Sequence, residues 1–286
     1  MKTFVINLDR RADRMNAVDL QMRRLGLQYE RFSAIDGLND QEQVAPANTL
    51  RFTVTQKKSP VRGELACAMS HIKVWQTFLD SDHEYALILE DDIQIGDEVP
   101  GVLKDFKSAP CFDFFNLSSA TPYRVNDDDI RFILDCHIRR RSQAKNKEQR
   151  RRWKSMEWRR RWKIYQLIEF SNGLVACECD PAPALGSGYI ISRRAAESFL
   201  KAATQLDFPI DLTWRHSGGR LIQGFMNRPI VRQTGLDTDI AGRFNQQRLS
   251  IPLRLLRPFY KNRRIRRRFD VFWMYTLGRR WTCDPS

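Results

Sequence analysis

The 286-residue sequence lacks any apolar run that approaches the roughly 20 residues needed to cross a membrane. Its first residues, MKTFVINLDRR, have too short an apolar stretch for a signal peptide and no small-residue cleavage site. We therefore expect the protein to be made and kept in the cytoplasm. Hydrophobic residues still make up 42% of the chain, which allows a real core in one large α/β domain with additions, or in two small domains.

Several familiar motifs are missing as well. There is no Walker loop, GxGxxG or HExxH pattern, no RRM, KH or helix-turn-helix signature, and no internal repeat. The six cysteines show no zinc pattern, because the single residue within Cys177-x-Cys179 suits neither CxxC redox chemistry nor a zinc knuckle. We interpret the cysteines as small buried hydrophobes in a reducing compartment.

The net charge of +14 is not spread evenly. Residues 139–163 carry a net charge of +11 and residues 254–281 carry +9, which leaves −6 for the rest of the chain. This distribution favours docking of two basic segments onto an anionic surface over a cationic active-site cleft.

Aromatic residues lie among these cations. They are Trp153, Trp158, Trp162 and Tyr165 in the first segment, and Phe259, Phe269, Phe272, Trp273 and Tyr275 in the second. Cations with interfacial aromatics suit an anionic membrane surface. Stacking on RNA and a solvated helical flap packed on the body are the alternatives. We favour the membrane, and we expect no nucleic-acid partner.

The chain opens with a βαβ pattern, which predicts a mostly parallel sheet. Residues 2–8 are expected to form the first strand, and a helix with its stop at Gly26 follows. The stretch LQYERFSAIDG, residues 27–37, is expected to be a second strand that ends in an Asp36-Gly37 turn. Residues 39–61 are polar and irregular, which predicts a loop. A second helix is expected to begin near Gly63, followed by a strand over residues 85–89.

Further along, residues 112–117 are expected to form a strand. Residues 124–170 are expected to form a largely helical, cationic insertion. The fold then resumes with one strand in GLVACECDPAPALGSGYIIS that enters the helix RRAAESFLKAA. We thus expect one catalytic domain over residues 1–250, interrupted by the insertion, and a basic amphipathic C-terminal segment over residues 251–286.

Three consecutive carboxylates, Glu90, Asp91 and Asp92, end the apolar strand YALIL. In an open parallel sheet, ligands bind beyond the carboxyl ends of the strands. Mn²⁺ and Mg²⁺ take oxygen ligands, usually one or two carboxylates together with substrate phosphates. The cluster therefore predicts a divalent-metal site beside a nucleotide diphosphate, with an acidic solvent-facing turn as the alternative.

Two other features fall on the same predicted edge. Arg10, Arg11 and Arg14 crowd the first turn of a helix, where the macrodipole disfavours cations, so a bound anion would offset that cost. Capping by Asp9 and pairing with Asp13 is the alternative. Glu64, Cys67 and His71 share one face of the second helix, although a lone histidine is more often structural.

Together, FVINLDRRADR, GELACAMSHIKVW, LILEDD and GSGYIISRRAAESFL resemble family 25 glycosyltransferases, which include lipooligosaccharide galactosyl- and glucosyltransferases and are related to collagen galactosyltransferases. The resemblance covers roughly residues 1–120 and 183–235. It implies a GT-A type fold, an inverting transfer from a UDP-hexose, with galactose favoured over glucose, and a lipid-linked oligosaccharide acceptor. It also implies peripheral association with the inner face of the bacterial cytoplasmic membrane.

The resemblance also implies roles for individual residues. Asp92 is the expected metal ligand, with Glu90 as a second one. The residues expected to bind the nucleotide, the diphosphate and the sugars are Asn7, Arg10, Arg14, Asp36, Glu64, His71, Glu90, Asp91, Gly186, Gly188 and Tyr189. The two glycines would let a sugar approach the backbone.

An inverting transfer needs one general base, and Asp211 in DFPIDLTWRH is the candidate. A helix N-cap at Asp211 and a base at Asp207 are the alternatives. The resemblance to GT-A enzymes implies a further metal ligand from a late histidine, but the last histidine here, His216, is too close to Asp211 for that role. Gln233, Asp237, Asp239 or water is therefore the expected substitute. The alternative functions are a nucleic-acid-binding protein and another metal-dependent phosphate-handling enzyme.

Overall fold

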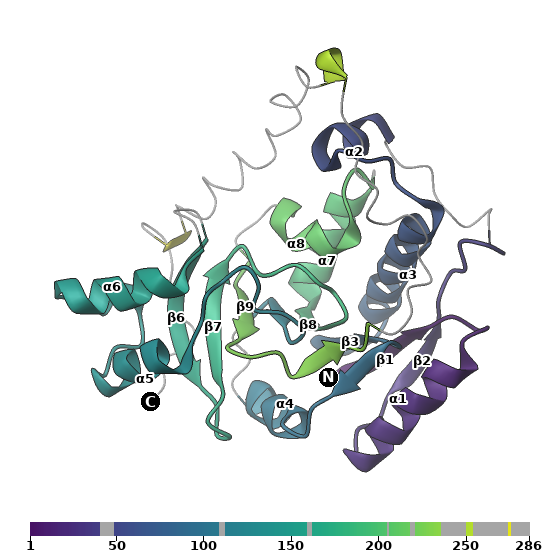
Figure 1. The fold of residues 1–286 in the computed structure, drawn as a ribbon. Helices are drawn as coiled ribbons and strands as arrows, with labels where there is room; N and C mark the ends of the chain where they lie inside the picture. The colour runs from purple at the N-terminus through teal and green to yellow at the C-terminus, as the bar shows by residue number, and fades with distance from the viewer. Residues whose placement is uncertain are drawn as a thin grey trace.

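An eight-stranded sheet forms the centre of the molecule in this computed structural model (Figure 1). The structure describes residues 1–40, 49–108, 112–158, 162–204, 206–217, 221–235, 250–253 and 274–275. The strands of the sheet, in spatial order, are β2 (Glu30–Ser33), β1 (Lys2–Asn7), β3 (Tyr85–Glu90), β8 (Gly188–Ser192), β5 (Phe114–Asn116), β9 (Gln223–Met226), β7 (Val175–Asp180) and β6 (Lys163–Glu169). A separate antiparallel pair joins β4 (Ile93–Ile95) to β10 (Val231–Gln233).

Six of the eight strands run in the same direction, and only β7 and β8 are reversed, which confirms the expected mostly parallel sheet. The reversal corrects one expectation. The stretch read as one strand before the helix RRAAESFLKAA forms two, β7 and β8, because the proline-containing turn DPAPALG separates them. The opening βαβ unit is parallel as predicted.

Helices cover both faces of this sheet. They are α1 (Ala12–Arg24), α2 (Thr49–Gln56), α3 (Arg62–Leu79), α4 (Val99–Ser108), α5 (Asp127–Asp135), α6 (Lys147–Met156), α7 (Arg193–Ala203) and the short α8 (Thr213–His216). Alternate residues of β1 and β3 belong to two separate cores, as the twofold period of a strand requires. Phe4, Ile6, Ala86 and Ile88 pack with α3 and α7, while Val5, Leu87 and Leu89 pack with α1 and α4.

One predicted loop contains a helix. Residues 39–61 were expected to be irregular, but residues 49–56 form α2, in which Phe52 and Val54 are buried. Their burial, together with the ion pair between Arg51 and the buried Asp207, holds a short helix that its own sequence does not favour. Residues 41–48 lie outside the described residues.

The segment 124–170 contains α5, a 3₁₀ turn over Arg141–Gln143 and α6, but its last residues form β6, the edge strand of the central sheet. Figure 1 shows α5 and α6 beside β6, at the end of the sheet away from α1. Trp153 is buried, and Trp162 packs on Tyr123 and under the Arg215 guanidinium. These two tryptophans therefore pack against the protein, which corrects the expectation that they face a membrane.

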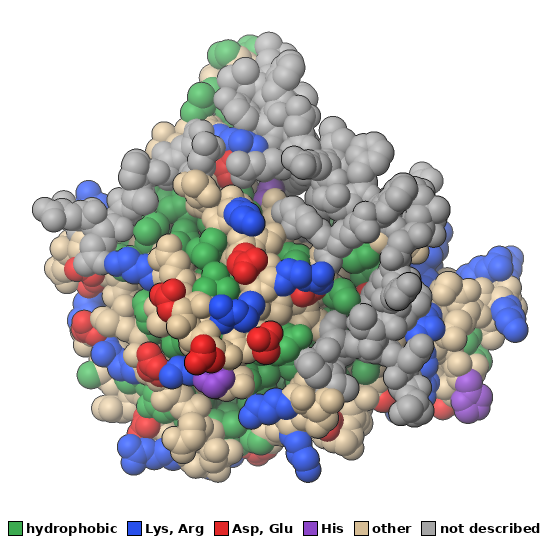
Figure 2. Space-filling view, turned by 180° about the vertical axis from the view of Figure 1, so that it is seen from behind, with side chains coloured by type: hydrophobic (Ala, Val, Ile, Leu, Met, Phe, Trp, Pro, Cys, Tyr) green, Lys and Arg blue, Asp and Glu red, His purple; other side chains and the backbone are tan. Residues whose placement is uncertain are grey.

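The charges of α6 point outward instead. Lys147, Arg150, Arg151 and Lys154 are exposed. Figure 2 shows blue and red side chains interspersed over the body and mainly blue ones on the arm at its right edge, where α5 and α6 lie. Most of the predicted C-terminal segment, residues 254–273 and 276–286, lies outside the described residues. Within the part of the chain that the structure describes, no helix is both long and apolar enough to span a bilayer.

Candidate active site

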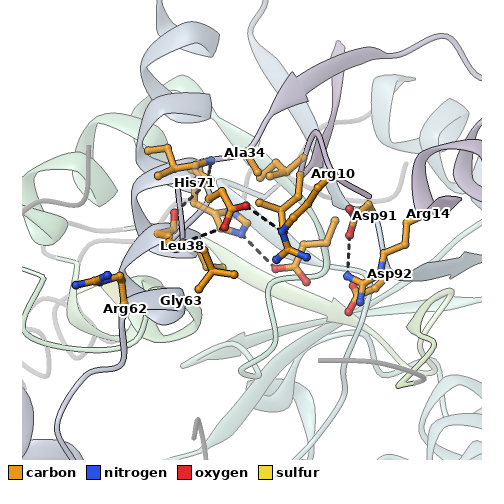
Figure 3. Close-up of a pocket in the computed structure, with 18 of the residues that line it drawn as sticks. Arg10, Arg14, Ala34, Leu38, Arg62, Gly63, His71, Asp91 and Asp92 are labelled. Atoms are coloured by element: carbon orange, nitrogen blue, oxygen red, sulfur yellow. Dashed lines mark hydrogen bonds and ion pairs between the residues drawn. The ribbon is translucent and has the colours of Figure 1, made fainter. Parts of the chain in front are cut away.

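A cavity of about 290 Å³ opens at the carboxyl ends of the parallel strands β2, β1 and β3. Residues after β1 and β2, the first turns of α3, the turn between β3 and β4, and Gln233 of β10 line it. Figure 3 shows Asp91, Asp92 and Arg14 together at one end and Arg62 at the other. The edge predicted from the strand order is thus where the structure has its cavity.

The three neighbouring carboxylates do not have equal surroundings. Asp91 accepts a hydrogen bond from Asn7 Nδ2 at 2.7 Å and pairs with Arg14 Nη1 at 3.4 Å. Burial raises the pKa of Asp91, and the bonds from Asn7 and Arg14 oppose that rise. Asn7 is itself buried and does not line the cavity, so it supports Asp91 from below. Both oxygens of Asp91 are already in use.

Asp92 differs from Asp91 in having one oxygen to spare. Its Oδ2 accepts from Gln233 Nε2 at 2.8 Å, and its backbone carbonyl accepts from the Thr234 backbone amide at 2.8 Å. The other oxygen, Oδ1, is buried and has no hydrogen-bond partner among the residues that the structure describes. A buried carboxylate oxygen without a partner is costly unless a cation or a donor satisfies it. Asp92 therefore fits the expected divalent-metal ligand.

Glu90 lies between Asp92 and α3, the helix that carries His71. Its Oε1 is 3.3 Å from His71 Nε2. Burial raises the pKa of Glu90, and the contact with His71 opposes the rise. A Cys67 Sγ, a His71 ring nitrogen and a Glu90 oxygen also lie within 4.8 Å of one another, a mixed donor set of the kind that Zn²⁺ prefers.

The first-turn arginines pair mainly with carboxylates of the cavity. Arg10 Nε donates to Asp36 Oδ2 at 2.9 Å, and Arg14 reaches Asp91. Although burial raises the pKa of Asp36, the bonds from the Leu38 amide and Arg10 lower it overall. Asp9 does not cap the helix, because its carboxylate accepts from Arg31 and Ser33. Asp13 pairs with Arg11.

Comparison with known proteins identifies the chain. The sequence model of glycosyltransferase family 25, described as an LPS biosynthesis protein, matches residues 1–214. The chain belongs to glycosyltransferase family 25.

Relatives of this family 25 chain come from distant organisms. A glycosyltransferase 25 family member of Drosophila pseudoobscura pseudoobscura is 31% identical over 96 residues, 32% of this chain and 15% of the relative. A putative glycosyltransferase of Haemophilus influenzae is 28% identical over 105 residues, 35% of this chain and 36% of the relative. Mouse procollagen galactosyltransferase 2 is 28% identical over 99 residues, 32% of this chain and 15% of the relative. The chain therefore matches well under half the length of each.

Some residues expected to bind ligands in this family 25 chain have structural roles. Glu64 ion-pairs with Lys58 Nζ at 2.5 Å and accepts from the Val61 amide, so it caps α3 outside the cavity lining. A Cβ on Gly188 would meet Val231 Cγ1 at 2.6 Å. The Val231 side chain of β10 therefore fills the space next to Gly188 and leaves no room there for a sugar. Tyr189 is buried, with its ring packed behind His71.

The predicted base, Asp211, lies in a 3₁₀ turn, Ile210–Leu212, and accepts a hydrogen bond from the Gly186 amide at 3.2 Å. It is close enough to Glu90 to raise the pKa of that carboxyl. It does not cap α8, whose N-cap position is Leu212. The competitor Asp207 is buried in its pair with Arg51. Asp237 and Asp239 lie outside the described residues.

Several cavity residues were not singled out from the sequence. Gly37, Leu38, Arg62 and Gly63 line the cavity. The Asp36-Gly37 turn was the available signal, because a Cβ at Gly37 would lie 3.2 Å from the Arg62 backbone. Glycine makes that approach of the loop after β2 to the start of α3 easier than any larger residue would, and a sequence alone does not show which backbone will lie opposite.

Proposed function

We propose that this family 25 chain is a metal-dependent, inverting hexosyltransferase that uses a UDP-hexose, with galactose favoured over glucose. Its acceptor is a lipid-linked oligosaccharide of lipopolysaccharide or lipooligosaccharide. Support for a sugar acceptor of this kind comes from the description of the family as LPS biosynthesis proteins, and support for galactose from the mouse relative named a procollagen galactosyltransferase.

One observation supports this proposal most strongly. Within the described part of the chain, the buried Asp92 Oδ1 lacks a hydrogen-bond partner, and it faces a cavity that Asp92, Arg10 and Arg14 line. Asp92 Oδ1 would bind a divalent cation, and the two arginines would bind phosphate oxygens, so together these residues suit a metal–diphosphate group. Mn²⁺ or Mg²⁺ held by Asp92, with Glu90 nearby, would neutralise charge on the departing diphosphate.

The chain's own residues then have distinct tasks. Arg10 and Arg14 bind and orient the diphosphate. Asp211 takes the proton of the acceptor hydroxyl as that oxygen forms a bond to C1 of the hexose. The bond between C1 and the diphosphate oxygen breaks, UDP leaves with the electron pair, and attack from the opposite face inverts C1.

An anionic membrane surface is the proposed partner for the arm formed by α5 and α6. The four exposed cations of α6 attract anionic headgroups by charge, since each basic residue near such a surface contributes about 1 kcal/mol. The buried Trp153 adds no aromatic insertion. This placement would hold the chain on the cytoplasmic face of the inner membrane, beside a lipid-linked acceptor.

Calorimetric titration with UDP, in the presence and absence of Mn²⁺, tests the donor site. We expect Mn²⁺ to tighten UDP binding, because a divalent cation held by Asp92 would attract the negatively charged diphosphate. A screen of UDP-sugars by mass spectrometry, with and without oligosaccharide acceptors, then identifies the hexose transferred. UDP affinity that is the same with and without metal would refute the metal-dependent site, and a chain that transfers no hexose would refute the proposed reaction.

A further inference from the structure

A buried hydrogen-bonded chain runs from the core to the cavity. Trp75 Nε1 donates to Tyr189 Oη at 2.8 Å, Tyr189 Oη is 2.9 Å from His71 Nδ1, and His71 Nε2 is 3.3 Å from Glu90 Oε1. The side chains of Trp75, Tyr189 and His71 are at most 2% exposed. These three side chains are therefore largely shielded from bulk solvent.

The direction of each hydrogen bond follows from the first one. The indole of Trp75 can only donate, so the Tyr189 oxygen accepts from it. Among the described residues, the other partner of that hydroxyl is His71 Nδ1, so the O–H proton points to Nδ1. A neutral imidazole that accepts at Nδ1 carries its proton on Nε2. His71 is thus a hydrogen-bond donor to Glu90.

We propose that Trp75, Tyr189 and His71 form a positioning chain that holds Glu90 as a hydrogen-bond acceptor for a hydroxyl of the donor's hexose. The backbone of Glu90 is fixed as well, because its amide donates to the Ser187 carbonyl at 3.0 Å. A carboxylate held at one oxygen still accepts from sugar hydroxyls. This inference rests on the proposed function, since it assigns the hexose of a UDP-hexose to Glu90.

The tautomer of His71 distinguishes two possible roles of this part of the cavity, metal binding and the positioning of Glu90. A metal bound by Cys67, His71 and Glu90 would need the lone pair of His71 Nε2, because that nitrogen faces Glu90. The positioning chain places a proton there instead. Metal binding therefore requires an unprotonated His71 Nε2, whereas the positioning role requires a protonated one.

Nitrogen NMR of the full chain labelled with ¹⁵N-histidine reads that atom directly. The chain has four histidines, and His71→Gln assigns the His71 signal. We expect a protonated Nε2 and an unprotonated Nδ1 that do not change when Zn²⁺ is added. A protonated Nδ1, or loss of the Nε2 proton on addition of Zn²⁺, would overturn the inference.

Tyr189→Phe tests the functional consequence, because it removes the hydroxyl that fixes the tautomer. We expect the affinity for UDP-galactose to fall about tenfold while the affinity for UDP stays the same. Tyr123→Phe is the matched control, since that buried hydroxyl donates to the Pro181 carbonyl away from the cavity. Equal weakening of both ligands would show a merely structural role and would overturn the inference.

His71 variants keep the test decisive if Tyr189→Phe does not fold. His71→Gln retains an N–H donor near the position of Nε2 and should keep most of the preference for UDP-galactose over UDP, whereas His71→Leu should lose it. Equal preferences in these two variants would contradict the positioning role. If the wild-type protein binds UDP-galactose no better than UDP, the proposed donor fails, while the NMR result still decides the hydrogen-bonded chain.

Discussion

Asp92 Oδ1 is the atom on which the proposed chemistry depends. Glu90 contacts His71, and Asp91 contacts Asn7 and Arg14. Asp92 Oδ1, in contrast, has no hydrogen-bond partner in the described ranges of the chain. Three adjacent carboxylates therefore serve different purposes, and single substitutions at each should give different results.

Asp92→Asn should abolish the gain in UDP affinity that Mn²⁺ provides, because an amide is a weak ligand for a hard cation. We expect the loss to be at least tenfold, measured by calorimetry at saturating Mn²⁺. Asp97→Asn is the control, since that carboxylate is exposed and pairs with Arg24. A variant at Asp92 that responds to Mn²⁺ like the wild type would remove Asp92 from the metal site.

Asp211→Asn should leave binding of UDP unchanged and lower the transfer rate by about 10²–10⁴, the usual contribution of a general base. Single-turnover transfer from UDP-galactose measures the rate, and calorimetry measures the binding. Asp207→Asn tests the competitor and should instead reduce stability, because it breaks a buried pair with Arg51. Near-normal transfer by Asp211→Asn would place the base elsewhere.

At the scale of elements, the site depends on how closely the β4–β10 pair approaches the central sheet. Gly188 of β8 lies directly beneath Val231 of β10, and Val231 is fully buried. The next residue but one along β10, Gln233, holds Asp92. A change in this contact should therefore affect both stability and the cavity.

Gly188→Ala should lower the free energy of unfolding by about 1–3 kcal/mol, because the new methyl group would overlap Val231. Urea unfolding measures the change, and Val231→Ala in the same chain should recover part of it. Gly101→Ala is the control, since its Cβ would meet only Asn172 Nδ2 at 3.6 Å. A Gly188 variant as stable as the wild type would contradict the close approach.

Asp129 joins α5 to α6 by accepting from Arg152 at 2.9 Å and Ser155 at 2.7 Å. Although burial raises the pKa of Asp129, these bonds lower it below its usual 3.8. The stability it contributes is therefore present above that usual value and is lost as the pH falls through the lowered pKa of the folded state.

Asp129→Asn should thus be less stable than the wild type by about 1–3 kcal/mol near neutral pH, and the difference should shrink in acid. Urea unfolding at a series of pH values measures both free energies. Asp128→Asn on the exposed side of the same turn is the matched control. A difference that stays constant down to about pH 3 would contradict the ionic link.

At the scale of the whole molecule, charge is divided between the body and the arm formed by α5 and α6 (Figure 2). The ion pairs on the arm tie Arg152 to Asp129 and Arg141 to Glu157. Figure 1 shows α6 at the opposite end of the sheet from α1, and the cations Lys147, Arg150, Arg151 and Lys154 of this helix are exposed. Binding of the arm to a membrane would therefore leave the cavity unobstructed by α6.

Replacing Lys147, Arg150, Arg151 and Lys154 by Gln should weaken binding to anionic vesicles about a hundredfold or more, because about 1 kcal/mol is lost per charge. Sedimentation with vesicles of anionic phospholipid measures the binding. Arg150→Lys with Arg151→Lys keeps the charge and should bind like the wild type. Unchanged binding of the Gln variant would exclude α6 as the contact.

Part of the fold and the site could be predicted from local patterns. Consecutive residues were enough to predict the strand YALIL, the helix around His71 and the βαβ opening. All three are present in the structure. The single strand expected before α7 was wrong, because the turn DPAPALG divides this stretch into β7 and β8, which pair with different strands of the sheet. The helix α2 was missed because its burial depends on contacts far away in the sequence.

The sequence by itself determined that acidic residues would end a buried strand and that arginines would start the first helix, because hydrophobic periodicity and strand ends are local properties. Only the tertiary structure decided which oxygen of which carboxylate would lack a partner. Asn7, His71 and Gln233 are 84, 19 and 141 residues along the chain from the acids that they contact. Local sequence patterns do not show that these residues will come together. Hydrogen-bond satisfaction is a property of the packed molecule, so it is settled only when the strands and helices have come together.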